Sequence, residues 1–165
     1  MIDYIGIDCG LDGALVILNS TGIVSMRDMP TKKEGKKRAI DIAALDEWFE
    51  KIRRSSTVAV VEDPGRHAPS AAGLRSMTYS FAVIEALLVA HRIDYITVMA
   101  RKWQKQFWTR PKHVEGKFDT KAAALSAANK IWQGTDWRRT QRSKKAFDGF
   151  VDAALIAEYG KIADH

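Results

Sequence analysis

Four carboxylates fall in apolar surroundings, where a negative charge is expensive. Asp8 ends the first apolar, β-branched run of the chain, and Glu62 ends a second run at 57–61. Asp148 and Asp152 lie in an almost wholly apolar helical segment and share one helical face, because they are four residues apart. A buried unpaired charge costs several kcal/mol, so each acid needs a cation or a partner. Two alternatives stay open: Glu62 turning outward at a strand end, and a solvent-facing acidic stripe on the helix.

The donor set defines the kind of metal site that these acids could form. Four carboxylates with no His or Cys among them suit Mg²⁺ or Mn²⁺ rather than zinc. Two such ions per site, ~4 Å apart, would activate a water molecule and stabilise the leaving oxygen of a phosphodiester. Cys9 is the single cysteine, which excludes an internal disulfide and a cysteine-based zinc site.

The elements that must position the acids follow from the apolar patterning. Glycine-containing turns separate three consecutive strands, which predicts an antiparallel meander. Two further strands alternate with helices, which predicts parallel crossover units. The expected fold class is therefore α/β, with a mixed five-stranded sheet (three antiparallel strands, then parallel) flanked by helices. The expected strands are 4–9, 13–19, 22–29, 57–61 and 95–99, and the expected helices are 41–54, 70–91, 119–133 and 144–162. Asp41 is predicted to cap the first helix, and the lysine-rich segment 31–37 is expected to be a loop.

Length and composition suit a single domain over residues 1–165 with an ordinary hydrophobic content of 46%. The net charge of +6 indicates either a polyanionic partner, most commonly nucleic acid, or simple solubility. No apolar run is expected to reach the ~20 residues that span a membrane. No secretory signal is visible, so a cytoplasmic location and no membrane partner are expected.

Basic residues gather in clusters that could contact phosphates. The candidate DNA-binding residues are Arg66, His67, Arg75, Arg101, Lys102, Lys105, Lys112, Lys117, Lys121, Arg138, Arg139 and Arg142. The aromatic residues Trp103, Phe107 and Trp108 are interleaved with these cations, so they either stack on exposed bases or pack in the core or a dimer interface.

Taken together, the acids and their elements resemble RuvC-type Holliday junction resolvases of the RNase H-like superfamily, over nearly the whole chain. The resemblance rests on Gly-Ile-Asp-Cys-Gly at 6–10, on Glu62, and on Asp-Gly-Phe-Val-Asp-Ala-Ala at 148–154. It is closest to the short phage forms, which implies a bacterial or phage-infected cytoplasm. Two features depart from the bacterial pattern: the helical acids are four rather than three residues apart, and Cys9 replaces a proline.

The resemblance implies a homodimer that binds four-way DNA junctions and makes paired symmetric nicks, leaving 5′-phosphate and 3′-hydroxyl ends. It assigns Asp8, Glu62, Asp148 and Asp152 as metal ligands and catalytic acids. Lys121 resembles the family's lysine near the scissile phosphate, where a cation could stabilise developing charge. It also implies that the helix at 70–91 builds the dimer interface.

Three other functions remain open. The same chemistry could act on flaps, forks or RNA–DNA hybrids, or the chain could be a non-catalytic module that binds branched DNA. Asp8-Cys9-Gly10 also resembles the phosphate loop of sugar kinases and actin-like ATPases, but those proteins need two such subdomains, and 165 residues are too few for both.

Overall fold

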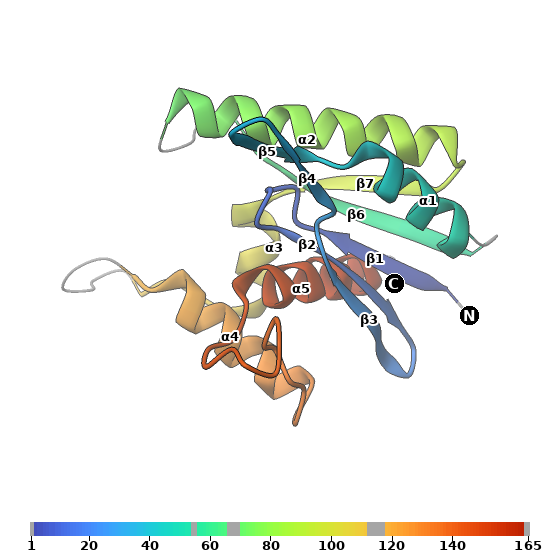
Figure 1. Cartoon of the computed structure of the whole chain (residues 1–165). Helices are drawn as coiled ribbons and strands as arrows, with labels where there is room; N and C mark the ends of the chain where they lie inside the picture. The colour runs from blue at the N-terminus through green and yellow to red at the C-terminus, as the bar shows by residue number, and fades with distance from the viewer. Residues whose placement is uncertain (1, 54–55, 66–69, 112–117, 164–165) are drawn as a thin grey trace.

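The computed structural model describes residues 2–53, 56–65, 70–111 and 118–163, and its centre is a five-stranded sheet (Figure 1). The strand order is β3-β2-β1-β6-β7. β1, β2 and β3 pair antiparallel, whereas β6 and β7 run parallel to β1. The predicted mixed sheet is therefore confirmed. The bounds are β1 Asp3–Ile7, β2 Ala14–Asn19, β3 Gly22–Asp28, β6 Thr57–Asp63 and β7 Asp94–Met99.

Helices cover both faces of this sheet. α1 (Ile42–Ile52) and α2 (Ala71–Ala90) lie on one face, and α5 (Asp148–Ala163) crosses the other, beside α3 (Ala100–Phe107) and α4 (Thr120–Ile131) (Figure 1). Each face has its own apolar core. The Asp41 carboxylate accepts a hydrogen bond from the Ala44 amide, which confirms its predicted role as the cap of α1.

Two glycines allow α5 to approach the sheet closely. A Cβ atom on Gly6 of β1 would lie 1.8 Å from the backbone oxygen of Ala153, and one on Gly160 would lie 2.2 Å from Val60 Cγ2. Real Cβ atoms do not approach other atoms this closely, so only glycine fits at either position without a shift. The helix that carries Asp152 is thereby held directly over β1, the strand that precedes Asp8.

The structure corrects two expectations about local structure. Segment 31–37 is not a loop: β4 (Thr31–Glu34) and β5 (Lys37–Ile40) form an antiparallel hairpin. The last helix begins at Asp148 rather than at 144, because the preceding segment is held by tertiary bonds. The Phe147 amide donates to the carbonyl of Trp137, and Arg139 pairs with Asp28 at 2.7 Å.

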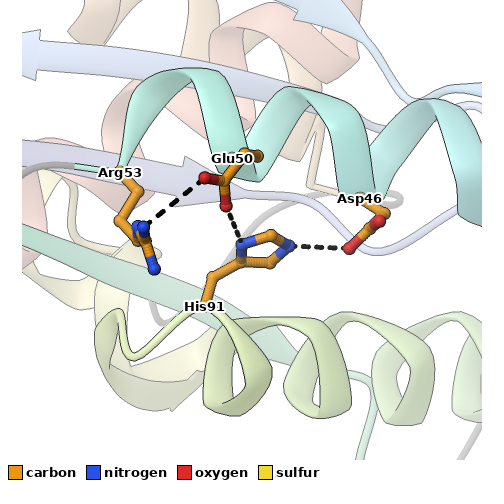
Figure 2. Close-up of polar contacts among 4 residues, drawn as sticks. All are labelled: Asp46, Glu50, Arg53 and His91. Carbon is orange, nitrogen blue, oxygen red and sulfur yellow. Dashed lines mark hydrogen bonds and ion pairs between the residues drawn. The ribbon is translucent and has the colours of Figure 1, made fainter.

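A polar clamp joins α1 to the end of α2 (Figure 2). The ring of His91 contacts Asp46 Oδ1 at 2.7 Å through Nε2 and Glu50 Oε2 at 3.1 Å through Nδ1, and Arg53 contacts the other oxygen of Glu50 at 3.4 Å. His91 is buried, and these two contacts give each of its ring nitrogens a polar partner, as buried polar atoms require.

One helix among the described residues, α2, is long and apolar enough to cross a membrane by length and composition alone, contrary to the sequence expectation. Core helices pass the same test, and Ile84 and Leu88 of α2 are fully buried against the sheet. Most of the helix is nevertheless not buried, and Tyr79 and Val89 are exposed. α2 therefore covers the sheet with one face and leaves an apolar face open.

Candidate active site

Asp8 stands at the end of the central strand of the sheet. It follows β1 directly, and its amide donates to the carbonyl of Ala14 at 3.1 Å, which continues the pairing with β2. The Gly10 amide donates to Asp8 Oδ1 at 3.3 Å. Backbone bonds on both sides of the turn thus fix the direction of this carboxylate.

Glu62 lies on the neighbouring parallel strand. β1 and β6 pair with Ile7 opposite Val61, so continuing the register by one residue places Asp8 beside Glu62. The indole Nε1–H of Trp103 donates to Glu62 Oε2 at 2.7 Å. Cys9 is buried and its thiol donates to the Glu62 carbonyl at 3.4 Å, in keeping with a packing role beside the site.

Asp148 and Asp152 belong to the first two turns of α5. Asp148 opens the helix, where its negative charge complements the helix dipole. Lys121, from the first turn of α4, donates to Asp148 Oδ2 and forms an ion pair with it. The hydrogen bond and charge of Asp148 raise the pKa of Lys121, so the amine stays protonated.

An open cleft of about 520 Å³ brings Asp8, Asp148, Asp152 and Lys121 together. The four-residue spacing therefore does place both helical acids on one cleft. Glu62 does not line this cleft: it lies on β6 beside Asp8 and is bonded to Trp103, and its charge helps to raise the pKa of Asp152. Asp12 and Arg38 also line the cleft and form an ion pair at 2.6 Å.

The acids raise one another's pKa values. Burial, and then the charges of Asp8, Glu62 and Asp148, raise the pKa of Asp152 from 3.8 to about 8, against the opposing charge of Lys121. Burial and the charge of Asp8 raise the pKa of Glu62 from 4.5 to about 7, although the bond from Trp103 opposes this. The pKa of Asp8 is also raised, mainly by burial. The cluster thus carries more negative charge than its surroundings compensate.

The chemistry of this donor set fits a hard divalent cation. Carboxylate oxygens are the preferred ligands of Mg²⁺ and Mn²⁺, and a cation over the cluster would offset both the burial and the mutual repulsion that raise the pKa values. Within the described ranges, no three His, Cys, Asp or Glu side chains already form a compact metal-binding group. Asp148 already contacts one positive charge, the ammonium of Lys121. A metal ion bound by Asp148 would therefore either displace this ammonium or bind beside it.

The predicted DNA-binding residues lie in different environments. Arg66, His67, Lys112 and Lys117 lie outside the described residues. Arg75 of α2 and Arg101, Lys102 and Lys105 of α3 are exposed, as is Arg142. Arg138 pairs with Asp136 and lowers the pKa of that acid to about 2, while Arg139 pairs with Asp28 and lies over the ring of Phe147. Both arginines are therefore engaged within the chain.

The three aromatic residues of the basic segment mainly pack in the interior. Trp103 is 1% exposed, and Phe107 and Trp108 pack against the same core. For Trp103 the structure selects packing over base stacking. Trp108 also lines an open cavity of about 450 Å³ with Arg101, Lys105 and Arg110.

Sequence reasoning missed the contact between Trp103 and Glu62 and the ion pair between Arg38 and Asp12. The first joins residues 41 positions apart and the second joins residues 26 positions apart. Neither pair falls in a motif, and Arg38 followed a segment that lacked strand-like alternation.

The sheet order and the crossing helix define an RNase H-like fold, and comparison with solved structures supports this assignment. The chain is similar to RuvC from T. thermophilus in complex with a Holliday junction substrate, with a TM-score of 0.67 and 10% identity over 99% of this chain and 96% of that one. A second Thermus thermophilus RuvC structure matches with a TM-score of 0.57 and 12% identity over 99% and 97% of the two chains. No family model and no curated protein matches the sequence. At these identities the likeness establishes the fold alone.

Proposed function

We propose that this chain is a metal-dependent, structure-selective endonuclease that resolves four-way DNA junctions and related branched DNA. The observation that carries the proposal is the convergence of Asp8, Asp148 and Asp152 on one cleft of an RNase H-like fold, with Glu62 on the neighbouring strand, where its charge helps to raise the pKa of Asp152. The similar RuvC of known structure was solved with a Holliday junction substrate, which favours branched DNA over other substrates.

In this proposal Asp8, Glu62, Asp148 and Asp152 hold two Mg²⁺ or Mn²⁺ ions. Bound ions would supply an activated water molecule and would stabilise the leaving oxygen. Asp8 occupies the most central position, because it follows β1, the middle strand of the sheet, and hydrogen bonds with Ala14 and Gly10 fix its direction. Lys121 lies at the mouth of the cleft with its side chain 75% exposed, where its ammonium can reach a phosphate.

Paired nicks require two active sites, so the proposal includes a homodimer. The exposed apolar face of α2, with Val89 near its C-terminal end, supports this helix as the contact surface. Ile84 and Leu88, which pack against the sheet, lie on the other side of the helix. Packing on the sheet and contact with a second copy would therefore use different faces of α2.

The test is to incubate the protein with a synthetic four-way junction, a flap, a plain duplex and an RNA–DNA hybrid, each with Mg²⁺, Mn²⁺ or EDTA. We expect paired symmetric nicks in the junction, none in EDTA, and none with Asp8→Asn. Cleavage that persists in EDTA or in Asp8→Asn would refute the metal mechanism. Selective cleavage of flaps or hybrids would move the proposal to those substrates, and junction binding without cleavage in any metal would indicate a binding module.

A further inference from the structure

The β4–β5 hairpin is an ordered element that has no role in the proposed cleavage chemistry. Its register pairs Lys33 with Arg38 and Glu34 with Lys37, and Gly35 in the turn has a φ of +62°. Arg38 binds Asp12, in the turn that follows Asp8, so the hairpin is tied directly to the active-site turn. At its other end Ile40 is buried in the core.

An open groove of about 750 Å³ separates this hairpin from the first turns of α2. In Figure 1 the hairpin lies along the half of α2 that begins at its N-terminus. The groove shares three lining residues, Leu11, Arg38 and Ser76, with the acidic cleft. Groove and cleft are therefore continuous, and a ligand in the cleft can extend into the groove.

The groove and the cleft have opposite charge. The groove is lined by Lys32, Lys37, Arg38 and Arg75, against a single acid, Glu34. Lys32 pairs with Glu34 at 3.4 Å and Arg38 with Asp12.

Lys37 and Arg75 are the cations of this groove that remain available to a ligand. Both are exposed, and neither has an ion pair within the described part of the chain. They stand on opposite walls, Lys37 on the hairpin and Arg75 on α2. Two cations on the walls of one open groove can both contact phosphates of a strand that lies in it.

We propose that this groove, which we name the hairpin groove, binds the sugar–phosphate backbone of the DNA strand that enters the acidic cleft. The inference rests on the proposed function, because it uses the cleft as the point of cleavage. The acids would hold metal ions at the scissile phosphate, while Lys37 and Arg75 would hold the phosphates beside it. A second copy of the chain is a poorer occupant, because the chain has a net charge of +6 and this surface is basic.

The groove variant carries two substitutions, Lys37→Ala and Arg75→Ala. It is compared with wild-type protein and with a matched control variant that carries Lys51→Ala and Lys130→Ala. The control removes the same charge from exposed lysines of α1 and α4. Binding of a fluorescent four-way junction is measured by anisotropy in EDTA at several salt concentrations. Sedimentation velocity measures the oligomeric state of each variant, and circular dichroism checks its fold.

We expect the groove variant to raise the Kd by roughly 5- to 30-fold at 0.15 M salt and to reduce the salt slope by about 2, since each lost phosphate contact removes about 1. The control should change the slope by less than about 0.5. Equal effects in both variants, or none in the groove variant, would overturn the proposal. Loss of self-association with unchanged DNA affinity would also overturn it, because the groove would then be an interface between copies.

The same assay separates this inference from the proposed function. If wild-type protein binds DNA through Lys37 and Arg75 but cuts no branched DNA with Mg²⁺ or Mn²⁺, the hairpin groove stands and the nuclease proposal fails. If wild-type protein cuts junctions but the groove variant binds and cuts equally well, the nuclease proposal stands and the groove fails.

Discussion

Neutralising Asp152 should stabilise the metal-free protein, and increasingly so as the pH rises from about 4 to about 8. In the fold its pKa is about 8 against an ordinary 3.8, because burial and the charges of Asp8 and Glu62 disfavour the carboxylate. The folded state therefore keeps a proton that the unfolded state has released above pH ~4. Stability is lost progressively as the pH rises from about 4 to about 8. Asp152→Asn keeps the shape of the side chain and has no proton to lose.

The magnitude follows from the same shift in pKa. Each tenfold change in acidity corresponds to about 1.4 kcal/mol, so the full shift is worth on the order of 5 kcal/mol. We expect the free energy of unfolding of Asp152→Asn, relative to wild type, to rise by about 2–5 kcal/mol between pH 4.5 and pH 8.5. For a domain of this size that gain corresponds to about 5–15 °C in Tm.

The assay is thermal unfolding in EDTA at several pH values, followed by circular dichroism. Glu47→Gln, on an exposed part of α1, is the matched control and should show no such trend. In Mn²⁺ at 100 times its Kd, wild-type protein should gain about 2.7 kcal/mol, and Asp152→Asn should gain less. A difference between Asp152→Asn and wild type that stays constant from pH 4.5 to pH 8.5 would refute the reasoning.

Three further substitutions test other contacts. Trp103→Phe removes the donor to Glu62 and should weaken Mn²⁺ binding about 10- to 100-fold by calorimetry, while junction affinity in EDTA stays within about threefold. Lys121→Met should lower the single-turnover cleavage rate about 10²- to 10³-fold with little change in junction Kd, as for other groups that stabilise developing charge. Gly6→Ala should lower the free energy of unfolding by at least about 3 kcal/mol in urea, because its Cβ would meet the backbone of Ala153.

Each of these variants has a control in the chain. Trp137→Phe removes an indole that bonds Asn129 rather than an acid of the site, so metal affinity should not change. Lys130→Met alters an exposed lysine of α4, and cleavage should continue at the wild-type rate. Gly22→Ala meets no atom within 4 Å but has a φ of +124°, so its cost is backbone strain alone. Metal binding unchanged in Trp103→Phe, or full activity in Lys121→Met, would contradict the assigned roles.

The sheet was predictable because its strands are mostly apolar and a glycine or proline turn follows four of the five. Helical spacing predicted that Asp148 and Asp152 share one face, and the need of buried acids for a cation, together with the resemblance to RuvC-type resolvases, joined them to Asp8. The β4–β5 hairpin was missed because its two four-residue strands, Thr-Lys-Lys-Glu and Lys-Arg-Ala-Ile, carry no alternating apolar signal. Two features hold the hairpin in place: the turn at Gly35, which has a positive φ, and the ion pair between Arg38 and Asp12.

The start of α5 and the position of Glu62 needed the structure for a different reason. Helical periodicity extended back to 144, but the Trp137–Phe147 backbone bond takes those residues out of the helix. Glu62 was correctly placed beside Asp8, but the indole donor from a distant helix that fixes the orientation of its carboxylate could not be predicted. Spacing in the sequence cannot show where a side chain finds its hydrogen-bond donor.

The strand order also gives the two halves of the site different local stabilities. β1 has a hydrogen-bonded neighbour on each side and a core on each face, so its amides should exchange with solvent on the slowest timescale of the chain. Asp148 opens α5 and is followed by buried residues, but its own side chain is half exposed and its partner is the exposed Lys121. Asp148 can therefore exchange that partner for another cation while Asp8 stays fixed by the strand before it.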